Sequence, residues 1–149
     1  MYIKQQIEIK RSQKEAFDYL KYADNQNYFS VWNMADPDKT ITRNGLDGTV
    51  GYINTWDSTN KNVGAGAQEI TKLVEPTTIE YDIRFERPMK SVANASFRIE
   101  STGANSCMVS WDFSSPTKFP MSLFNFIFKI MLGKNMRESM NNLKQILEK

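Results

Sequence analysis

The residues that could carry acid–base, nucleophilic or metal chemistry are few in this chain. Histidine is absent and Cys107 is the only cysteine. The commonest general base, the commonest transition-metal ligand and every Ser-His or Cys-His nucleophile pair are therefore excluded, as are an internal disulfide and a cysteine cluster for zinc. Asp36 and Asp38 flank Pro37 without a glycine-bearing ligand loop, so they indicate a solvated turn. We expect no metal, no cofactor and no catalytic residue set.

Glu69 is the remaining candidate for proton transfer. The strand expected around Glu69 shows no clear alternation of polar and apolar residues. Either Gln68, Ile70 and Val74 face the interior, or Glu69, Thr71 and Leu73 do. An interior Glu69 would have a raised pKa and could act as an acid or a base. Both phases stay open on the sequence alone.

Length and composition indicate one cytoplasmic domain. A chain of 149 residues buries enough surface for one core, and we expect a single domain over residues 1–149. Nineteen Lys and Arg stand against seventeen Asp and Glu, for a net charge of +2, and the basic residues are scattered. This distribution argues against a nucleic-acid partner. The N-terminal segment lacks the features of a secretory signal, so the cytoplasm is the expected compartment.

Turn residues and hydrophobic periodicity divide the chain into an α+β order. An alternating segment over 3–9 leads, through a capping box at Ser12 and Glu15, into a helix over 13–22 and a second short helix over 25–29. A helix of about thirty residues begins near Pro120 and reaches almost to the C-terminus. The strands expected between them lie near 40–43, 50–57, 65–75, 78–86, 91–101 and 106–114.

Apolar and polar residues alternate along three of these strands, so each strand has one solvent-facing (wet) face and one inward-facing (dry) face. The dry faces carry Ile79, Tyr81, Ile83 and Phe85; Ala93, Ala95, Phe97 and Ile99; and Cys107, Val109, Trp111 and Phe113. Cys107 is thus expected to be a small core residue. The long helix is apolar nearly all round in its first half, which at about a dozen residues is too short for stable membrane insertion. Its second half has one stripe expected to be buried, Met136, Met140, Leu143 and Leu147.

The element order and several short motifs resemble the helix-grip fold of START-like proteins. The motifs are Trp32, residues 48–51 with Trp56, residues 64–71, 85–88, 109–111, 131–135 and 142–144. Together they resemble the bacterial SRPBCC group of polyketide cyclase/dehydratase and lipid-transport proteins over essentially the whole chain. The resemblance implies a curved antiparallel sheet wrapped around a long C-terminal helix, with two short helices after the first strand and an apolar ligand cavity between sheet and helix. It carries over no catalytic residue.

A ligand-binding hollow is therefore expected where the dry faces of the sheet meet the first half of the long helix. Its lining should be mostly apolar, with a few polar groups that orient a ligand. The expected lining residues are Tyr52, Trp56, Gln68, Tyr81, Phe85, Phe97, Trp111, Phe124, Phe128 and Met131. A solid aromatic core is the alternative, and small residues such as Ala95 and Gly133 fit either arrangement.

Three functions remain open. The leading interpretation is binding, carriage or sensing of a small hydrophobic ligand, such as a lipid, an isoprenoid or a polyketide-like molecule. A cyclase or dehydratase would act mainly by holding a flexible chain in one folded pose. A module that acts on a chaperone or a partner enzyme would need an exposed patch. The apolar half of the long helix admits three roles: a cavity wall, the contact of a homodimer, or a membrane-docking surface near Lys118, Lys129 and Lys134.

Overall fold

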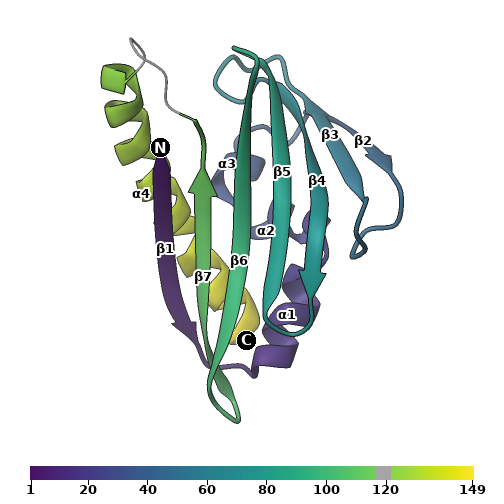
Figure 1. Ribbon diagram of the computed structural model, residues 1–149, viewed down its shortest axis with the longest axis vertical. Helices are drawn as coiled ribbons and strands as arrows, with labels where there is room; N and C mark the ends of the chain where they lie inside the picture. Colours follow the sequence, from purple (N-terminus) through teal and green to yellow (C-terminus); the bar gives the residue numbers. More distant parts are fainter. Residues whose placement is uncertain (117–121) are drawn as a thin grey trace.

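A seven-stranded antiparallel sheet curves around helices that lie on one of its faces (Figure 1). The computed structural model describes residues 1–116 and 122–149, with side chains described through 116 and from 129 onward. The strands within these residues are β1 Tyr2–Ile9, β2 Thr40–Asn44, β3 Ile53–Asp57, β4 Ala65–Val74, β5 Thr78–Arg87, β6 Ser91–Gly103 and β7 Ser106–Ser114. The helices are α1 Gln13–Leu20, the 3-10 turn η1 Ala23–Asn25, α2 Gln26–Phe29, α3 Val31–Met34 and α4 Ser122–Leu147.

The strand order is β1-β7-β6-β5-β4-β3-β2, a meander to which the first strand is added beside the last. β1 and β2 are therefore the two edges of the sheet. This arrangement, with short helices after β1 and a C-terminal helix of 26 residues, is the expected helix-grip α+β fold.

The short helices after β1 follow local capping signals. The N-cap bond of the expected capping box is present, because the Ser12 hydroxyl accepts a hydrogen bond from the Glu15 backbone amide at 3.1 Å. The same hydroxyl donates to the Glu15 carboxylate at 3.1 Å. α1 ends at Leu20, two residues earlier than predicted, and the Asp47 carboxylate then caps η1 through the amides of Ala23 (2.8 Å) and Asp24 (3.0 Å). The sequence prediction missed α3, a single turn that follows α2 directly.

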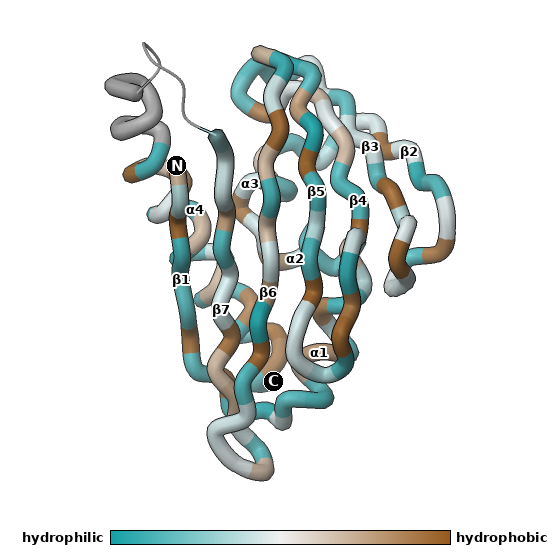
Figure 2. The backbone as a smooth tube through the Cα atoms, viewed as in Figure 1, coloured by the Kyte–Doolittle hydropathy of each residue, from teal (hydrophilic) through white to brown (hydrophobic). Residues whose placement is uncertain are grey.

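Cross-strand pairing places the predicted dry faces together on the concave side of the sheet. Ile79 pairs with Phe97 and Phe97 with Trp111, while Tyr81 pairs with Ala95 and Ala95 with Phe113. Hydrophobic and hydrophilic residues alternate along these strands, as Figure 2 shows. β3 starts at Ile53, not at residue 50, because the chain turns at Gly51, whose φ of 97° favours glycine.

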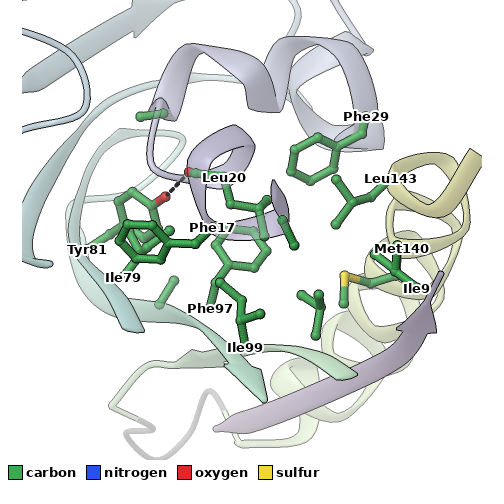
Figure 3. Close-up of a cluster of buried hydrophobic side chains, with 14 of the residues drawn as sticks. Ile9, Phe17, Leu20, Phe29, Ile79, Tyr81, Phe97, Ile99, Met140 and Leu143 are labelled. Atoms are coloured by element: carbon green, nitrogen blue, oxygen red, sulfur yellow. Dashed lines mark hydrogen bonds between the residues drawn. The ribbon is translucent and has the colours of Figure 1, made fainter. Parts of the chain in front are cut away.

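The core lies where α1, α2 and the second half of α4 meet the sheet (Figure 3). Phe17 and Leu20 from α1 and Phe29 from α2 point toward Phe97 on β6, and all four side chains are fully buried. Met140 and Leu143 from α4 close the cluster beside Ile9 of β1. Cys107 is also fully buried, as expected.

Helix α4 packs along β1 and against α2 and α3. Its predicted stripe is confirmed for Met136, Met140 and Leu143, which are buried, whereas Leu147 is only partly buried. The backbone N–H of Val31 donates to the Ser139 hydroxyl at 2.9 Å, and the side-chain amide of Asn142 donates to the Phe29 backbone carbonyl at 3.1 Å. These two bonds fix the orientation of the helix over the short helices.

Candidate functional site

Burial on the concave face changes along the strands. Residues near the α1 end, such as Ile79, Tyr81 and Phe97, are fully buried. Toward the end of the sheet where β5 and β7 finish, five large side chains on the same face keep part of their surface exposed: Trp56, Ile83, Phe85, Trp111 and Phe113. We call these five residues the upper concave face. The predicted dry face of β5 is therefore confirmed, but its residues are not buried equally: Ile79 and Tyr81 are buried, whereas Ile83 and Phe85 are only partly buried.

The aromatic rings form two groups across this face. The Phe97 and Trp111 rings are stacked with their centroids 5.1 Å apart, and Phe29 meets each of them edge-on at 6.2 Å. Trp56 and Phe85 form a second, T-shaped pair at 6.0 Å. Phe29 and Phe97 therefore belong to a rigid floor, Trp111 borders this floor from the upper concave face, and Trp56 and Phe85 make a wall on β3 and β5.

Gly66 explains how the Trp56 ring fits against the sheet. Gly66 is the cross-strand partner of Trp56, and a Cβ atom at position 66 would lie 2.7 Å from that indole. Only glycine leaves room for the ring to lie flat over β4. The indole N–H donates to the Val63 carbonyl at 3.2 Å, so the ring presents carbon, rather than its polar edge, to the concave side.

Two amide side chains add polar groups to the interior. Gln68 lies on the concave face opposite Ile83, is 9% exposed, and makes no side-chain hydrogen bond to the described residues. Gln26 on α2 is 4% exposed, and its side-chain amide faces the Tyr81 hydroxyl, an interaction that lowers the pKa of Tyr81 and opposes the effect of burial. Buried amide donors ordinarily have a partner, and for Gln26 that partner is Tyr81. Gln68 is therefore the amide that suits a ligand oxygen or a water molecule. The sequence prediction included Gln68 among the lining residues but not Gln26, which it placed only in the short helix over 25–29.

Both buried tyrosines have engaged hydroxyl groups. Tyr52 precedes β3 and donates to Asp24 at 2.7 Å, and Asp24 also accepts a hydrogen bond from Arg43 at 2.7 Å. Burial and the Asp24 carboxylate raise the pKa of Tyr52 well above its ordinary value. Burial likewise raises the pKa of Tyr81, whose hydroxyl points to the Leu20 carbonyl at 3.5 Å. Tyr52 thus ties the β2–β3 hairpin to η1, and Tyr81 belongs to the floor.

The acidic candidates lie elsewhere. Glu69 faces the convex side, where both terminal nitrogens of Arg84 lie 3.2 Å from its carboxylate, so the alternative with Glu69 in the interior is wrong. Asp36 accepts hydrogen bonds from the Ser58 hydroxyl and the Asp38 amide, and these bonds lower its pKa. No cluster of three or more potential metal ligands occurs among the described residues.

The remaining residues predicted to line the hollow lie in helix α4, in the core cluster and on the upper concave face. Phe124 and Phe128 belong to α4, but their side chains lie outside the described residues. The Met131 side chain is 50% exposed. Tyr81 and Phe97 lie in the core cluster, whereas Trp56, Phe85 and Trp111 lie on the upper concave face with Gln68 nearby. The role of all these residues as ligand contacts stays a prediction.

The fold and its inward-facing apolar surface define a START-like, SRPBCC-type domain. The chain belongs to the family described as polyketide cyclase/dehydrase and lipid transport, which matches residues 2–148. The resemblance seen in the sequence motifs is thus confirmed. No curated protein sequence matches the chain.

Solved structures share the fold at low sequence identity. The Aha1 dimer from Colwellia psychrerythraea is 18% identical, with a TM-score of 0.68 over 99% of this chain and 96% of that one. A protein from Arthrobacter aurescens is 14% identical, with a TM-score of 0.70 over 98% and 85% of the two chains. A protein from Chromobacterium violaceum is 12% identical, with a TM-score of 0.69 over 99% and 98%. Likeness at these identities establishes the fold alone.

Proposed function

We propose that the protein binds a small hydrophobic ligand against the upper concave face and carries or senses it without chemical conversion. A lipid, an isoprenoid or a polyketide-like molecule has the required chemistry. The observation that carries the proposal is the group of large apolar side chains that point inward from the sheet and yet remain partly exposed, among them Trp56, Phe85 and Trp111. Covering such surface is favourable by roughly 25 cal/mol per Å² of apolar area.

The polar groups around this face favour binding over catalysis. Gln68 offers a neutral amide on the concave side of β4, opposite Ile83. Amides can orient a hydroxyl or carbonyl group of a ligand, but they do not transfer protons at neutral pH. The raised pKa of Tyr81 keeps its phenol protonated, and Glu69 points to the opposite face of the sheet. A cyclase or dehydratase activity has no comparable support.

The test combines native mass spectrometry with uptake of an environment-sensitive apolar dye. Gently purified protein should carry a bound small molecule, and the protein freed of it should increase the fluorescence of the dye. The Ile83→Asn variant places an amide on the upper concave face and should weaken dye binding roughly tenfold, because covering an unpaired amide costs about 1–3 kcal/mol. Asp82→Asn is the matched control, because Asp82 is the preceding residue of β5 and is exposed on the convex face.

Two results would contradict the proposal. One is a wild-type protein that takes up neither dye nor any co-purifying small molecule. The other is equal dye binding by Ile83→Asn and Asp82→Asn while circular dichroism shows both variants folded. A protein that converts a polyketide-like substrate would instead support the cyclase alternative.

A further inference from the structure

A groove of about 600 Å³ runs between the edge strand β1 and helix α4. Its walls are mostly apolar, with Tyr2 and Ile3 on the strand and Ile130 and Gly133 on the helix. Tyr2 is 54% exposed and Ile130 is 61% exposed. Large apolar side chains gathered on one open surface are typical of a contact site.

Four basic side chains line the same groove: Lys4, Lys129, Lys134 and Arg137. The lining contains no acidic residue, and none of the four forms an ion pair with another described residue. Asp112 is the cross-strand partner of Lys4 and accepts a hydrogen bond from the Ser96 hydroxyl at 2.7 Å. The groove is therefore a local concentration of positive charge in a chain that has nineteen basic and seventeen acidic residues.

The sequence extends this asymmetry beyond the groove. From Phe113 through Arg137 the chain contains four basic residues, Arg137 included, and no Asp or Glu. The first acidic residue of α4 is Glu138, which follows the last residue of the groove. An anionic partner would therefore meet little repulsion along this side of the molecule.

We propose that the β1–α4 groove docks onto the surface of a bilayer that contains anionic lipid. Ile130 and Tyr2 would enter the headgroup region, while the four basic side chains contact lipid phosphate and carboxylate groups. Surfaces that combine an apolar centre with a basic rim have this preference. No helix in the described residues is long and apolar enough to cross a membrane, so the contact is with the bilayer surface.

Vesicle co-sedimentation of the ligand-free protein tests this inference. The protein should bind vesicles of phosphatidylcholine with phosphatidylserine and not vesicles of phosphatidylcholine alone. Binding should fall steeply as salt rises from about 50 to about 300 mM, because the charges are exposed to screening. Each basic residue near an anionic surface contributes about a fivefold gain in partitioning, so the Lys129→Gln/Lys134→Gln variant should bind roughly 30-fold more weakly.

The matched control is Lys61→Gln/Lys72→Gln, which removes the same charge from exposed positions outside the groove. It should bind like the wild type, and so should Ile83→Asn, so this inference and the proposed ligand site can fail separately. Equal losses in the two double variants, equal binding to neutral vesicles, or no binding to anionic vesicles would overturn the inference. A further contradicting outcome is a wild-type protein that binds no vesicles but forms a homodimer, which the Ile130→Asp substitution dissociates. The groove would then be an interface between two copies of the chain.

Discussion

The Phe97→Ala substitution tests whether the lower half of the concave face is a solid core. Phe97 is 0% exposed, and its ring contacts Trp111 at 5.1 Å, Phe29 at 6.2 Å and Tyr81 at 6.2 Å between centroids. Truncation of a buried Phe to Ala typically costs about 3–5 kcal/mol, the sum of lost transfer free energy and a cavity. Because three aromatic pairs of about 0.5–1.5 kcal/mol each are lost as well, we expect the upper end of that range.

Phe113→Ala is the matched comparison on the same face. Phe113 lies on β7 two residues beyond Trp111, pairs with Ala95, and is only partly buried. Full burial of such a side chain stabilises by about 1.5–3 kcal/mol, so partial burial should make this substitution cost about 1–2 kcal/mol. The two variants remove the same atoms, and the difference between them therefore measures how closed each part of the face is.

Equilibrium urea unfolding, followed by both circular dichroism and tryptophan fluorescence, gives the two free energies. Coincident transitions are needed for a two-state treatment. A loss below about 2 kcal/mol for Phe97→Ala, or a loss equal to that of Phe113→Ala, would refute the division into floor and upper concave face. Phe97 would then border a hollow, as predicted when the sequence placed it among the residues that line a ligand cavity.

Two further predictions concern pH and capping. Burial raises the pKa of Tyr81, so the folded protein holds the phenolic proton more tightly than the unfolded chain. The contribution of Tyr81 to stability should therefore be constant below about pH 10, the pKa of an unfolded tyrosine, and should fall above it. Urea unfolding of Tyr81→Phe between about pH 9 and 11 should show a smaller fall than the wild type, and an identical fall would contradict the reasoning. Ser12→Ala removes the cap of α1 and should cost about 1 kcal/mol in the same assay at neutral pH. No measurable cost would mean that the cap is dispensable in the folded protein.

The fold was predictable because local and periodic signals agree in this chain. The dry faces of β5, β6 and β7 were assigned from period-two alternation, and the register confirms them through pairs such as Phe97 with Trp111. The capping box at Ser12 placed α1. α3 was missed because it is a single turn, too short to show a helical period, and it is held by contacts with α4 that lie more than a hundred residues away.

The candidate site was predictable in type but less so in placement. Alternation assigns a residue to a face but does not tell where along the strand the helices cover that face. Ile79 and Phe85 therefore looked equivalent, although only Ile79 is fully buried, in the cluster that contains Phe17 and Leu20 of α1. The phase of Glu69 was ambiguous because β4 contains an irregularity between Ile70 and Lys72, which shifts its alternation.

The placement of α4 connects the closed floor, the upper concave face and the β1–α4 groove. The second half of the helix joins α1 and α2 over the floor, where its stripe of Met136, Met140 and Leu143 is buried. At Gly133 the helix lies beside β1, since a Cβ atom there would be 3.8 Å from both Ile3 and Gln5. Lys129 and Lys134 are exposed beside this contact. Among residues 1–116 and 129–149, the side chains of the upper concave face are less buried than those of the floor. Stability therefore resides mainly in the floor, and the surfaces that we assign to ligand and to lipid can change in sequence without loss of the fold.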